Sequence, residues 1–560
     1  MHGLMQNHPL LVSSLIEHAA VAHPHAEIVS CTPGRGRVRH TYADIARRAR
    51  QVSGALGALG IVEGDRVGTM AWNGHRHVEL IYGSSGIGAV AHTINPRLYP
   101  EQIEYIINHA EDSCLFFDLS FLPLLEQLAP RLESVRRYIA LASPEEMPRS
   151  AVLDLLCYEE LIGSQDPALR WPRLDERAAS SLCYTSGTTG HPKGVLYSHR
   201  STVLHSMAAC MADAMSLTAA ESVLLAAPMF HANGWGLPYS AALSGASLTL
   251  PGSALDGRSV YELMRSEGVT ILAGVPTVLL MLQQYVEAEG QPPSGEFELR
   301  RVFTGGAAVP RSVVEFFERA FDAHVLHAWG MTETSPIGTV GGLLRKHRRL
   351  SADERIDVVL KQGRAPYGVE LKIAGVDGET QPRDGRTPGR LFVRGHWVSS
   401  GYFGAGNGSA LDGDGWFDTG DIATIDPDGY LQITDRAKDV IKSGGEWISS
   451  IDLENAAMSH PAVLEAAAIG VPHAKWQERP FLLVVRRPDR PLDREELLTF
   501  LAGKVAKWWL PDGVAFVSEL PHTATGKLQK AMLRERYAQG EFRMQEAPAG
   551  TCDQKSSPRI

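Results

Sequence analysis

The sequence has few cysteines, and nothing in their spacing pairs them. Its 560 residues include six cysteines, none in a Cys-x-x-Cys pair: Cys31, Cys114, Cys157, Cys183, Cys210 and Cys552. Zinc sites and disulfide frameworks announce themselves by close, repeated cysteine spacing, so neither organises this chain. Scattered thiols are typical of proteins in a reducing compartment, and we therefore expect a cytoplasmic location.

Long apolar runs and an excess of positive charge are missing as well. No stretch reaches the roughly 20 apolar residues of a transmembrane helix. The first 20 residues lack a basic segment, and Glu17 and His18 interrupt their apolar run, so we predict no signal peptide. The formal net charge of −10 argues against nucleic acid as the main partner. An anionic ligand in a local basic site is still compatible with that charge.

The composition is that of a globular protein, and the length indicates two or more domains. Hydrophobic residues make up 44% and charged residues 21% of the chain. Residues 10–60 resemble two amphipathic helices around a polar turn at 32–39. Short β-prone runs at 65–72, 88–95 and 113–118 alternate with helical patterns, which predicts a parallel sheet with covering helices. Residues 363–395 predict a β-rich subdomain, and the segment from about 450 to 537 predicts a compact α+β unit with one helix over 494–509.

The most informative stretch is LCYTSGTTGHPKGVLYSHR, residues 182–200. Glycines let backbone N–H groups turn inward, hydroxyls add donors and Lys193 supplies a positive charge, so the loop is suited to wrap a phosphate. A plain surface loop is the alternative that composition alone favours. The nucleoside-triphosphatase loop is a nearer rival, but Pro192 replaces its second glycine and Gly194 replaces its magnesium-binding hydroxyl.

Two further segments suggest a nucleotide site. RVFTGGAAVP, residues 301–310, is a strand that ends in two glycines, where a planar base can lie close to the backbone. HAWGMTETSP, residues 327–336, offers the aromatic face of Trp329 and an oxygen cluster that includes Glu333, as a hard cation requires. A tight turn and a solvated surface glutamate are the ordinary alternatives.

The segment PMFHANGWGLPYSAAL, residues 228–243, mixes aromatic residues with glycines. Such a cluster is commonly a buried helix entry. The functional interpretation is an acyl pocket, with Trp235 between two glycines and His231 beside Phe230. Farther on, IATI and YLQI flank Asp-Pro-Asp-Gly at 426–429, which predicts a hairpin. Just before it, Asp421 is either a ribose ligand or an ordinary turn aspartate.

YTSGTTGHPKG resembles the phosphate-binding signature of the adenylate-forming superfamily, which includes acyl-CoA synthetases, amino-acid adenylation domains and luciferases. HAWGMTETSP resembles its adenine and magnesium motif, and the resemblance extends over about residues 10–540. It implies a large N-terminal AMP-binding domain at 1–434, in which mixed and parallel sheets with covering helices carry a β-rich subdomain. A small mobile α+β domain at 435–540 and a disordered tail at 541–560 follow. Asp435, in the D-R-x-K-D motif, becomes the hinge.

The resemblance also implies residue roles. Lys527 matches the catalytic lysine, Thr185 and Glu333 bind Mg²⁺, and His231 joins the catalytic set. ATP and coenzyme A would contact Thr185, Ser186, Gly187, Thr188, Thr189, Lys193, Gly306, Ala307, Ala308, His327, Ala328, Trp329, Gly330, Thr334, Asp421, Arg436, Ser443, Gly444, Gly445, Glu446 and Trp447. The acyl pocket would include His231, Trp235, Gly305 and Gly306.

The implied reaction is ATP-dependent acyl-CoA synthesis through an acyl-AMP, with release of AMP and pyrophosphate. Amino-acid adenylation domains carry an aspartate where this chain has His231, so an acid without an ammonium group is favoured. The resemblance is strongest to medium- and long-chain fatty acyl-CoA ligases and 3-methylthiopropionyl-CoA ligases, and it implies a homodimer. A ligase that loads a separate carrier protein, an aryl acid-CoA ligase, a luciferase-like oxygenase and a nucleotide sensor without turnover are the alternatives.

Overall fold

A computed structural model describes residues 1, 3–32, 36–185, 191–290, 295–375, 378–443, 446–488, 490–522 and 528–542, with the side chains at 32, 446 and 447 excluded. Its internal contacts divide the chain into two compact units. Among the described residues, the first unit covers 1–433 and the second covers 434–522 and 528–542. Both combine sheets and helices, as the predicted α/β class requires.

The first unit contains a seven-stranded sheet that leads into the predicted phosphate loop. In spatial order its described strands are β7 (Leu155–Cys157), β6 (Tyr138–Ala140), β5 (Asp112–Phe117), β3 (Arg66–Met70), β4 (Val90–Thr93), β8 (Ala179–Tyr184) and β9 (Gly194–Ser198). Neighbours are parallel except β8 and β9, which are antiparallel. The predicted parallel strands therefore form, and the loop that joins β8 to β9 starts at the sheet's carboxyl edge.

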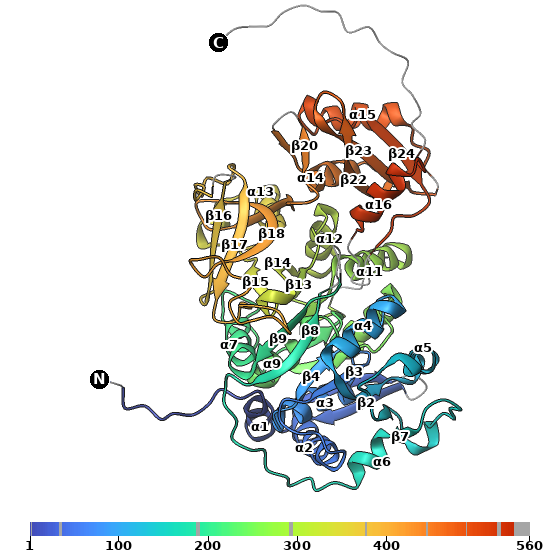
Figure 1. Ribbon diagram of the computed structural model, residues 1–560. Coiled ribbons are helices and arrows are strands. Elements are labelled where there is room, and N and C mark those ends of the chain that lie inside the picture. The colour runs from blue at the N-terminus through green and yellow to red at the C-terminus, as the bar shows by residue number, and fades with distance from the viewer. Residues whose placement is uncertain are drawn as a thin grey trace, which may run out of the picture. The chain divides into compact units, whose positions relative to one another are not determined.

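An eight-stranded sheet carries the predicted base-binding segments. Its described strands, in order, are β15 (Ile337–Val340), β14 (His324–Gly330), β13 (Arg301–Gly305), β12 (Ile271–Ala273), β10 (Ser222–Leu225), β11 (Ser247–Leu250), β1 (Glu27–Thr32) and β2 (Gly36–Thr41). The run from β14 to β1 is parallel, and the two edge strands are antiparallel. Strands β13 and β14 lie side by side in Figure 1, so their carboxyl ends open at one edge.

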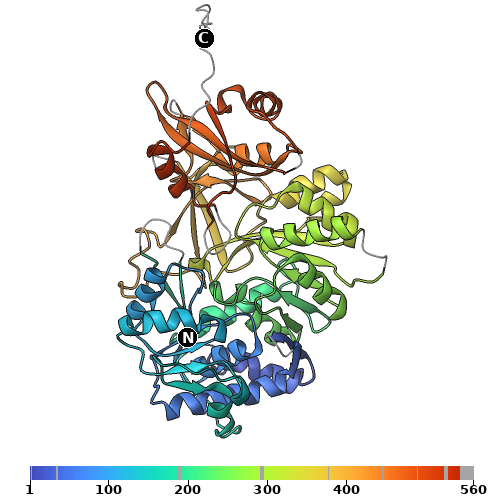
Figure 2. The same ribbon diagram turned by 90° about the vertical axis from the view of Figure 1, so that its right-hand side faces the viewer.

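Helices cover both faces of these sheets (Figures 1 and 2). One shared core packs helices from both sheets against one another: α1 (Val12–Ala22), α2 (Tyr42–Ala58), α3 (His75–Gly86), α7 (His199–Cys210) and α9 (Leu237–Ser244). The outer faces carry α4 (Pro100–Ala110), α5 (Leu122–Leu128), α10 (Gly257–Ser266), α11 (Pro276–Glu289), α12 (Arg311–Phe321) and α13 (Ala352–Leu360). The short α6 (Tyr158–Gly163) packs against α2.

The β-rich subdomain is a four-stranded sheet that completes the first unit. Its order is β16 (Val369–Ala374), β17 (Gly389–Gly395), β18 (Phe417–Ile425) and β19 (Leu431–Arg436). The predicted turn at 426–429 joins β18 to β19, where the Gly429 N–H donates to the Asp426 carbonyl at 2.9 Å. The loop 396–416 between β17 and β18 reaches the predicted site, as shown below.

The second unit has a five-stranded sheet with three helices. Its described strands are β20 (Ile441–Ser443), β21 (Glu446–Ile448), β22 (Val463–His473), β23 (Gln477–Arg486) and β24 (Gly513–Val517). The helices are α14 (Ser450–Met458), α15 (Arg494–Ala502) and α16 (Lys530–Ala538). Ser449 caps α14, because its side chain accepts from the Asp452 N–H. The α+β character predicted for this segment is thus observed.

Two local predictions are wrong. The two helices predicted within 10–60 form, but the polar turn predicted at 32–39 is replaced by strands β1 and β2, which pair with each other, and β1 also pairs with β11. The helix predicted over 494–509 ends at Ala502, where Gly503 is followed by a separate 3₁₀ turn at Lys507–Trp509. Long-range strand pairing decides the first case, and Gly503 ends the helix in the second. The predicted tail lies outside the described residues from 543 onward.

Candidate active site

The base of the phosphate loop is closed by two residues that the sequence singles out. Thr185 donates its N–H to the Lys193 carbonyl at 2.9 Å, and the Lys193 N–H donates to Thr185 Oγ1 at 3.1 Å. These bonds continue the β8–β9 pairing beyond the sheet, so Thr185 and Lys193 face each other at the two ends of the loop. Ser186, Gly187, Thr188 and Thr189 lie outside the described residues.

The ends of β13 and β14 form the next wall. Gly305 pairs in register with Ala328, and His327 Nε2 lies 3.3 Å from the Ala307 carbonyl. Gly306 has φ +85°, a conformation that side chains rarely adopt, so glycine is required at this turn before Ala308. Burial lowers the pKa of His327, which therefore stays neutral. The structure brings the two predicted base-binding segments together at one sheet edge.

Trp329 is buried, and its polar atom holds Asp421. The indole is 7% exposed and packs into the core of the β-rich subdomain, while its N–H donates to Asp421 Oδ2 at 2.9 Å. Asp421 itself is only 2% exposed. Gly330 allows the strand to pass the chain, since a Cβ there would lie 2.0 Å from the Pro336 carbonyl oxygen. In this geometry Trp329 orients the carboxylate predicted to bind ribose.

Glu333 sits in a short 3₁₀ turn, Thr332–Thr334, and is 6% exposed. Its Oε1 accepts the Tyr402 hydroxyl at 2.8 Å, and the described residues provide it with no lysine or arginine partner. Thr334 is fully buried, and its hydroxyl donates to the Met331 carbonyl. A buried carboxylate without an internal cation fits a site that receives one from outside.

The predicted acyl segment adopts an unusual backbone. Five consecutive residues, from Ala232 to Gly236, have positive φ values of 38°, 41°, 61°, 58° and 72°. Each non-glycine residue pays about 1–2 kcal/mol in this left-handed region. The Ser181 hydroxyl donates to Asn233 Oδ1 at 3.0 Å and holds the turn on β8. Strain of this kind persists where surroundings enforce it, commonly at functional sites.

Trp235 at the end of this turn is 7% exposed, and its ring lies edge-on to Phe303 of β13 at 5.7 Å. His231 is the residue before helix α8 (Ala232–Trp235), and its side chain makes no capping hydrogen bond there. The predicted pocket residues Gly305 and Gly306 directly follow Phe303 in the chain. Trp235 thus packs on β13, the strand that ends at Gly305.

The remaining candidates that the structure describes belong to the second unit. Asp435 is 1% exposed, and its carboxylate accepts the N–H groups of Arg436 at 2.7 Å and Ser450 at 2.6 Å. Burial raises the pKa of Asp435, and the nearby Lys530 opposes that shift. Ser443 accepts from Arg479 at 3.2 Å. Glu446 and Trp447 lie on β21, while Gly444, Gly445 and Lys527 are outside the described residues.

Sequence reasoning missed Tyr402, which contacts two predicted site residues at once. Its hydroxyl donates to Glu333, and Lys193 Nζ lies 4.8 Å from the centroid of its ring. The only signal in the sequence is an aromatic residue after Gly401 in a loop between strands, which is too common to be specific.

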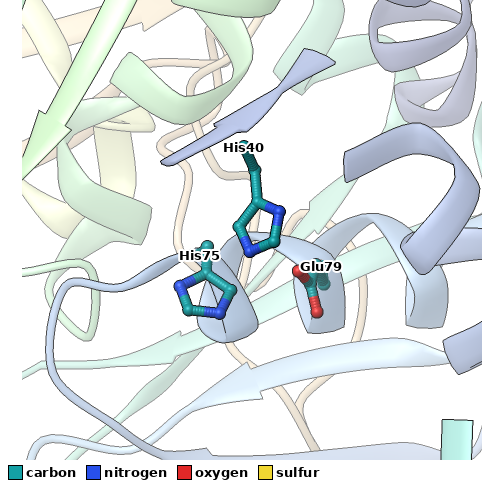
Figure 3. Close-up of side chains that lie close together, drawn as sticks. All are labelled: His40, His75 and Glu79. Carbon is teal, nitrogen blue, oxygen red and sulfur yellow. The ribbon is translucent and has the colours of Figure 1, made fainter. Parts of the chain in front are cut away.

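A second polar cluster, His40, His75 and Glu79, has ligand-type atoms within 4.8 Å of one another (Figure 3). Arg48 grips both oxygens of Glu79 at 2.7 and 3.1 Å, and the Tyr158 hydroxyl adds a third bond at 2.6 Å. The charge of the Glu79 carboxylate is therefore already compensated by Arg48. We therefore assign the cluster to the packing of α2 against α3, outside the candidate active site.

Comparisons with known proteins identify the family of this chain. The family model for AMP-binding enzymes matches residues 16–403, and the model for their C-terminal domain matches residues 452–527. The chain is 49% identical to a medium-chain-fatty-acid–CoA ligase of Ectopseudomonas oleovorans over 96% of this chain and 98% of that one. It is also 49% identical to a 3-methylmercaptopropionyl-CoA ligase of Ruegeria lacuscaerulensis, over 96% and 99%.

A solved structure of an anthranilate CoA ligase in complex with anthranoyl-AMP matches with a TM-score of 0.84 and 26% identity, over 96% of this chain and 100% of that one. Among the residues described, no helix is both long and apolar enough to span a membrane. Two family models in sequence order and relatives at nearly half identity along the chain lead to one conclusion: this protein belongs to the AMP-binding enzymes, as its resemblance to adenylate-forming acyl-CoA synthetases predicts.

Proposed function

We propose that the protein is an ATP-dependent acyl-CoA ligase that activates a carboxylic acid as its acyl-AMP and transfers the acyl group to coenzyme A. The observation that carries this proposal is the buried carboxylate of Glu333, which has no lysine or arginine partner among the described residues. Tyr402 contacts both this carboxylate and Lys193 of the phosphate loop. The CoA ligases among its relatives support the same reaction.

In the first step a carboxylate oxygen attacks the α-phosphorus of ATP. A new oxygen–phosphorus bond forms, the bond to the bridging oxygen breaks, and pyrophosphate leaves with the electron pair. Negative charge spreads over the phosphate oxygens, so the protein must present fixed donors and positive charge. Lys193 and the loop amides serve that need, and Asp421, oriented by Trp329, receives the ribose hydroxyls.

Glu333 and Thr185 would hold Mg²⁺. When bound, the ion would supply positive charge against the triphosphate. The fit rests on donor chemistry, since a carboxylate and a hydroxyl are hard oxygen ligands.

In the second step the thiol sulfur of coenzyme A attacks the acyl carbon, AMP leaves, and the thiol proton passes to solvent. We propose that Lys527 serves the first step and that rotation about Asp435 brings Gly444 and Gly445 to the site for the second. Lys527→Ala should then abolish acyl-AMP formation while thioester formation from supplied acyl-AMP is largely kept. Equal loss in both half-reactions would refute the proposed rotation between the two steps.

For the acid, we propose a medium- or long-chain fatty acid or 3-methylthiopropionate. His231 and Trp235 offer neither a carboxylate for a substrate ammonium nor a fixed cation. The strained turn gives Trp235 a defined position at the end of β13, where it can limit chain length. Trp235→Ala should shift the preferred length, with each methylene worth about 1–3 kcal/mol. An unmoved preference would make Trp235 a core residue.

The decisive experiment is a panel of short, medium, long, aryl and methylthio acids with ATP and Mg²⁺. Pyrophosphate release and thioester formation are measured with coenzyme A, with a carrier protein, and without acceptor. Thioester formed on the carrier alone would favour a carrier-loading ligase, and preference for aryl acids would favour an aryl acid-CoA ligase. No turnover with any acid would contradict the proposal.

We propose a cytoplasmic location from the scattered thiols and a homodimer from the resemblance. Light scattering of the purified chain tests the dimer.

A further inference from the structure

The loop 396–416 touches both sides of the candidate active site. The Phe403 N–H donates to the Gly194 carbonyl at 2.8 Å, immediately after Lys193. The Ser399 N–H donates to the Glu333 carbonyl, also at 2.8 Å. Backbone bonds therefore tie one loop to the phosphate loop and to the carboxylate-bearing turn, and Tyr402 lies between these two ties.

Tyr402 contacts the charged ends of both segments through different parts of its side chain. The hydroxyl donates to Glu333 Oε1 at 2.8 Å, and the ring face receives Lys193 Nζ at 4.8 Å from its centroid. The ring also rests on Phe417 of β18, with centroids 6.4 Å apart. This packing restricts the movement of the ring and so holds both the hydroxyl and the ring face in place.

Neither contact removes charge. A phenol hydroxyl is a neutral donor, and an aromatic ring attracts a cation without neutralising it. A direct pair between Lys193 and Glu333 would cancel the two charges that the reaction needs, and within the described part of the chain the two residues form no such pair.

We propose that Tyr402 is a positioning residue: it orients Glu333 for a divalent cation and Lys193 for the phosphates, and it keeps the two from pairing. This inference rests on the proposed function and adds a residue to it. Partners of metal-ligating carboxylates typically change metal affinity 10- to 100-fold when removed. Because the hydroxyl contacts Glu333 and the ring contacts Lys193, we expect that the loss of metal affinity and the loss of ATP affinity can be separated by mutation.

Tyr402→Phe keeps the ring and deletes the hydroxyl, whereas Tyr402→Leu deletes both contacts. For Tyr402→Phe we expect the Mg²⁺ concentration for half-maximal pyrophosphate release to rise about ten-fold. Saturating Mg²⁺ should restore kcat to within about three-fold, and KM for ATP at saturating metal should stay unchanged. For Tyr402→Leu we expect the same metal defect and a KM for ATP raised a further two- to five-fold, because the cation–π contact is lost.

A direct measurement complements turnover. Mn²⁺ binding to protein saturated with a non-hydrolysable ATP analogue, followed by electron paramagnetic resonance, should weaken about ten-fold in Tyr402→Phe. The matched control is Tyr197→Phe, which removes a hydroxyl that donates to the neighbouring Thr332 carbonyl at 2.7 Å without touching the Glu333 carboxylate. This control should lower the melting temperature but leave the Mg²⁺ concentration for half-maximal pyrophosphate release and the Mn²⁺ affinity unchanged.

If the Mg²⁺ requirement and the Mn²⁺ affinity of Tyr402→Phe stay within two-fold of wild type, the inference is overturned. Equal shifts of these two quantities in Tyr197→Phe would overturn it as well. If wild type releases no pyrophosphate with any acid at any Mg²⁺ concentration, the proposed function fails instead. Active wild type with unmoved Tyr402 variants therefore defeats the positioning role alone.

Discussion

Two buried glutamates, one in each unit, differ in how their charge is compensated. Glu333 and Glu454 are both 6% exposed. Glu454 lies 2.7 Å from Lys530 Nζ and accepts the Ala468 N–H at 2.8 Å. Glu333 receives only neutral donors among the described residues. Burying a charge is costly unless a partner compensates it. Lys530 provides that partner for Glu454, whereas the described residues provide no cation for Glu333, which agrees with the metal role proposed for it.

The largest effect should come from breaking the compensated pair. Lys530→Met leaves Glu454 buried without its cation, and such changes cost about 3–5 kcal/mol. Hydrogen exchange of α14 and β22 in the full chain measures the opening free energy locally. The double variant Glu454→Gln/Lys530→Met should recover much of the loss, because no uncompensated charge remains. Equal losses in the single and double variants would show that packing of the Lys530 chain, and not charge, holds this region.

The uncompensated glutamate should behave in the opposite way. Glu333→Gln keeps the volume and removes the charge, so pyrophosphate release should fall about 10²- to 10³-fold, or about 2.7–4 kcal/mol. Stability should stay the same or rise, since a buried charge without an internal partner is gone. Steady-state kinetics and the melting temperature check the two halves. A destabilised but active Glu333→Gln would place Glu333 in the same class as Glu454.

The contrast also marks what the sequence could predict. Thr185, Lys193 and Glu333 stand in contiguous motifs whose residue types suit phosphate and cation chemistry, and these local patterns can be read directly. Contacts between distant segments cannot. Tyr402 meets Glu333 only because β17 and β18 carry a loop back to the site, and Lys530 meets Glu454 through α14 and α16. Strand β1 was missed for the same reason, because it is completed by β11 far along the chain.

The second unit surrounds one lysine with several buried carboxyls, which sets its pH response. Burial raises the pKa values of Asp435, Asp452 and Glu454, the last to about 7. A group whose pKa rises on folding stabilises the fold below its unfolded value, 4.5 for Glu454, and this contribution is lost as pH rises through about 7. Glu454 loses this contribution between pH 4.5 and about pH 7, so the second unit should be less stable at pH 8 than at pH 6.

The first unit should respond with the opposite sign. Burial lowers the pKa values of His75 and His205 to about 3 and of His77 to about 4, so these side chains stay neutral when folded. Their unfolded forms take up protons below about pH 6.5, and stability falls as pH falls. Hydrogen exchange at pH 6 and pH 8, corrected for intrinsic rates, should show the second unit protected better at pH 6 and the first at pH 8. Glu454→Gln should flatten the response of the second unit only. The same sign in both units would mean that one of these two buried groups of side chains does not titrate as its burial requires.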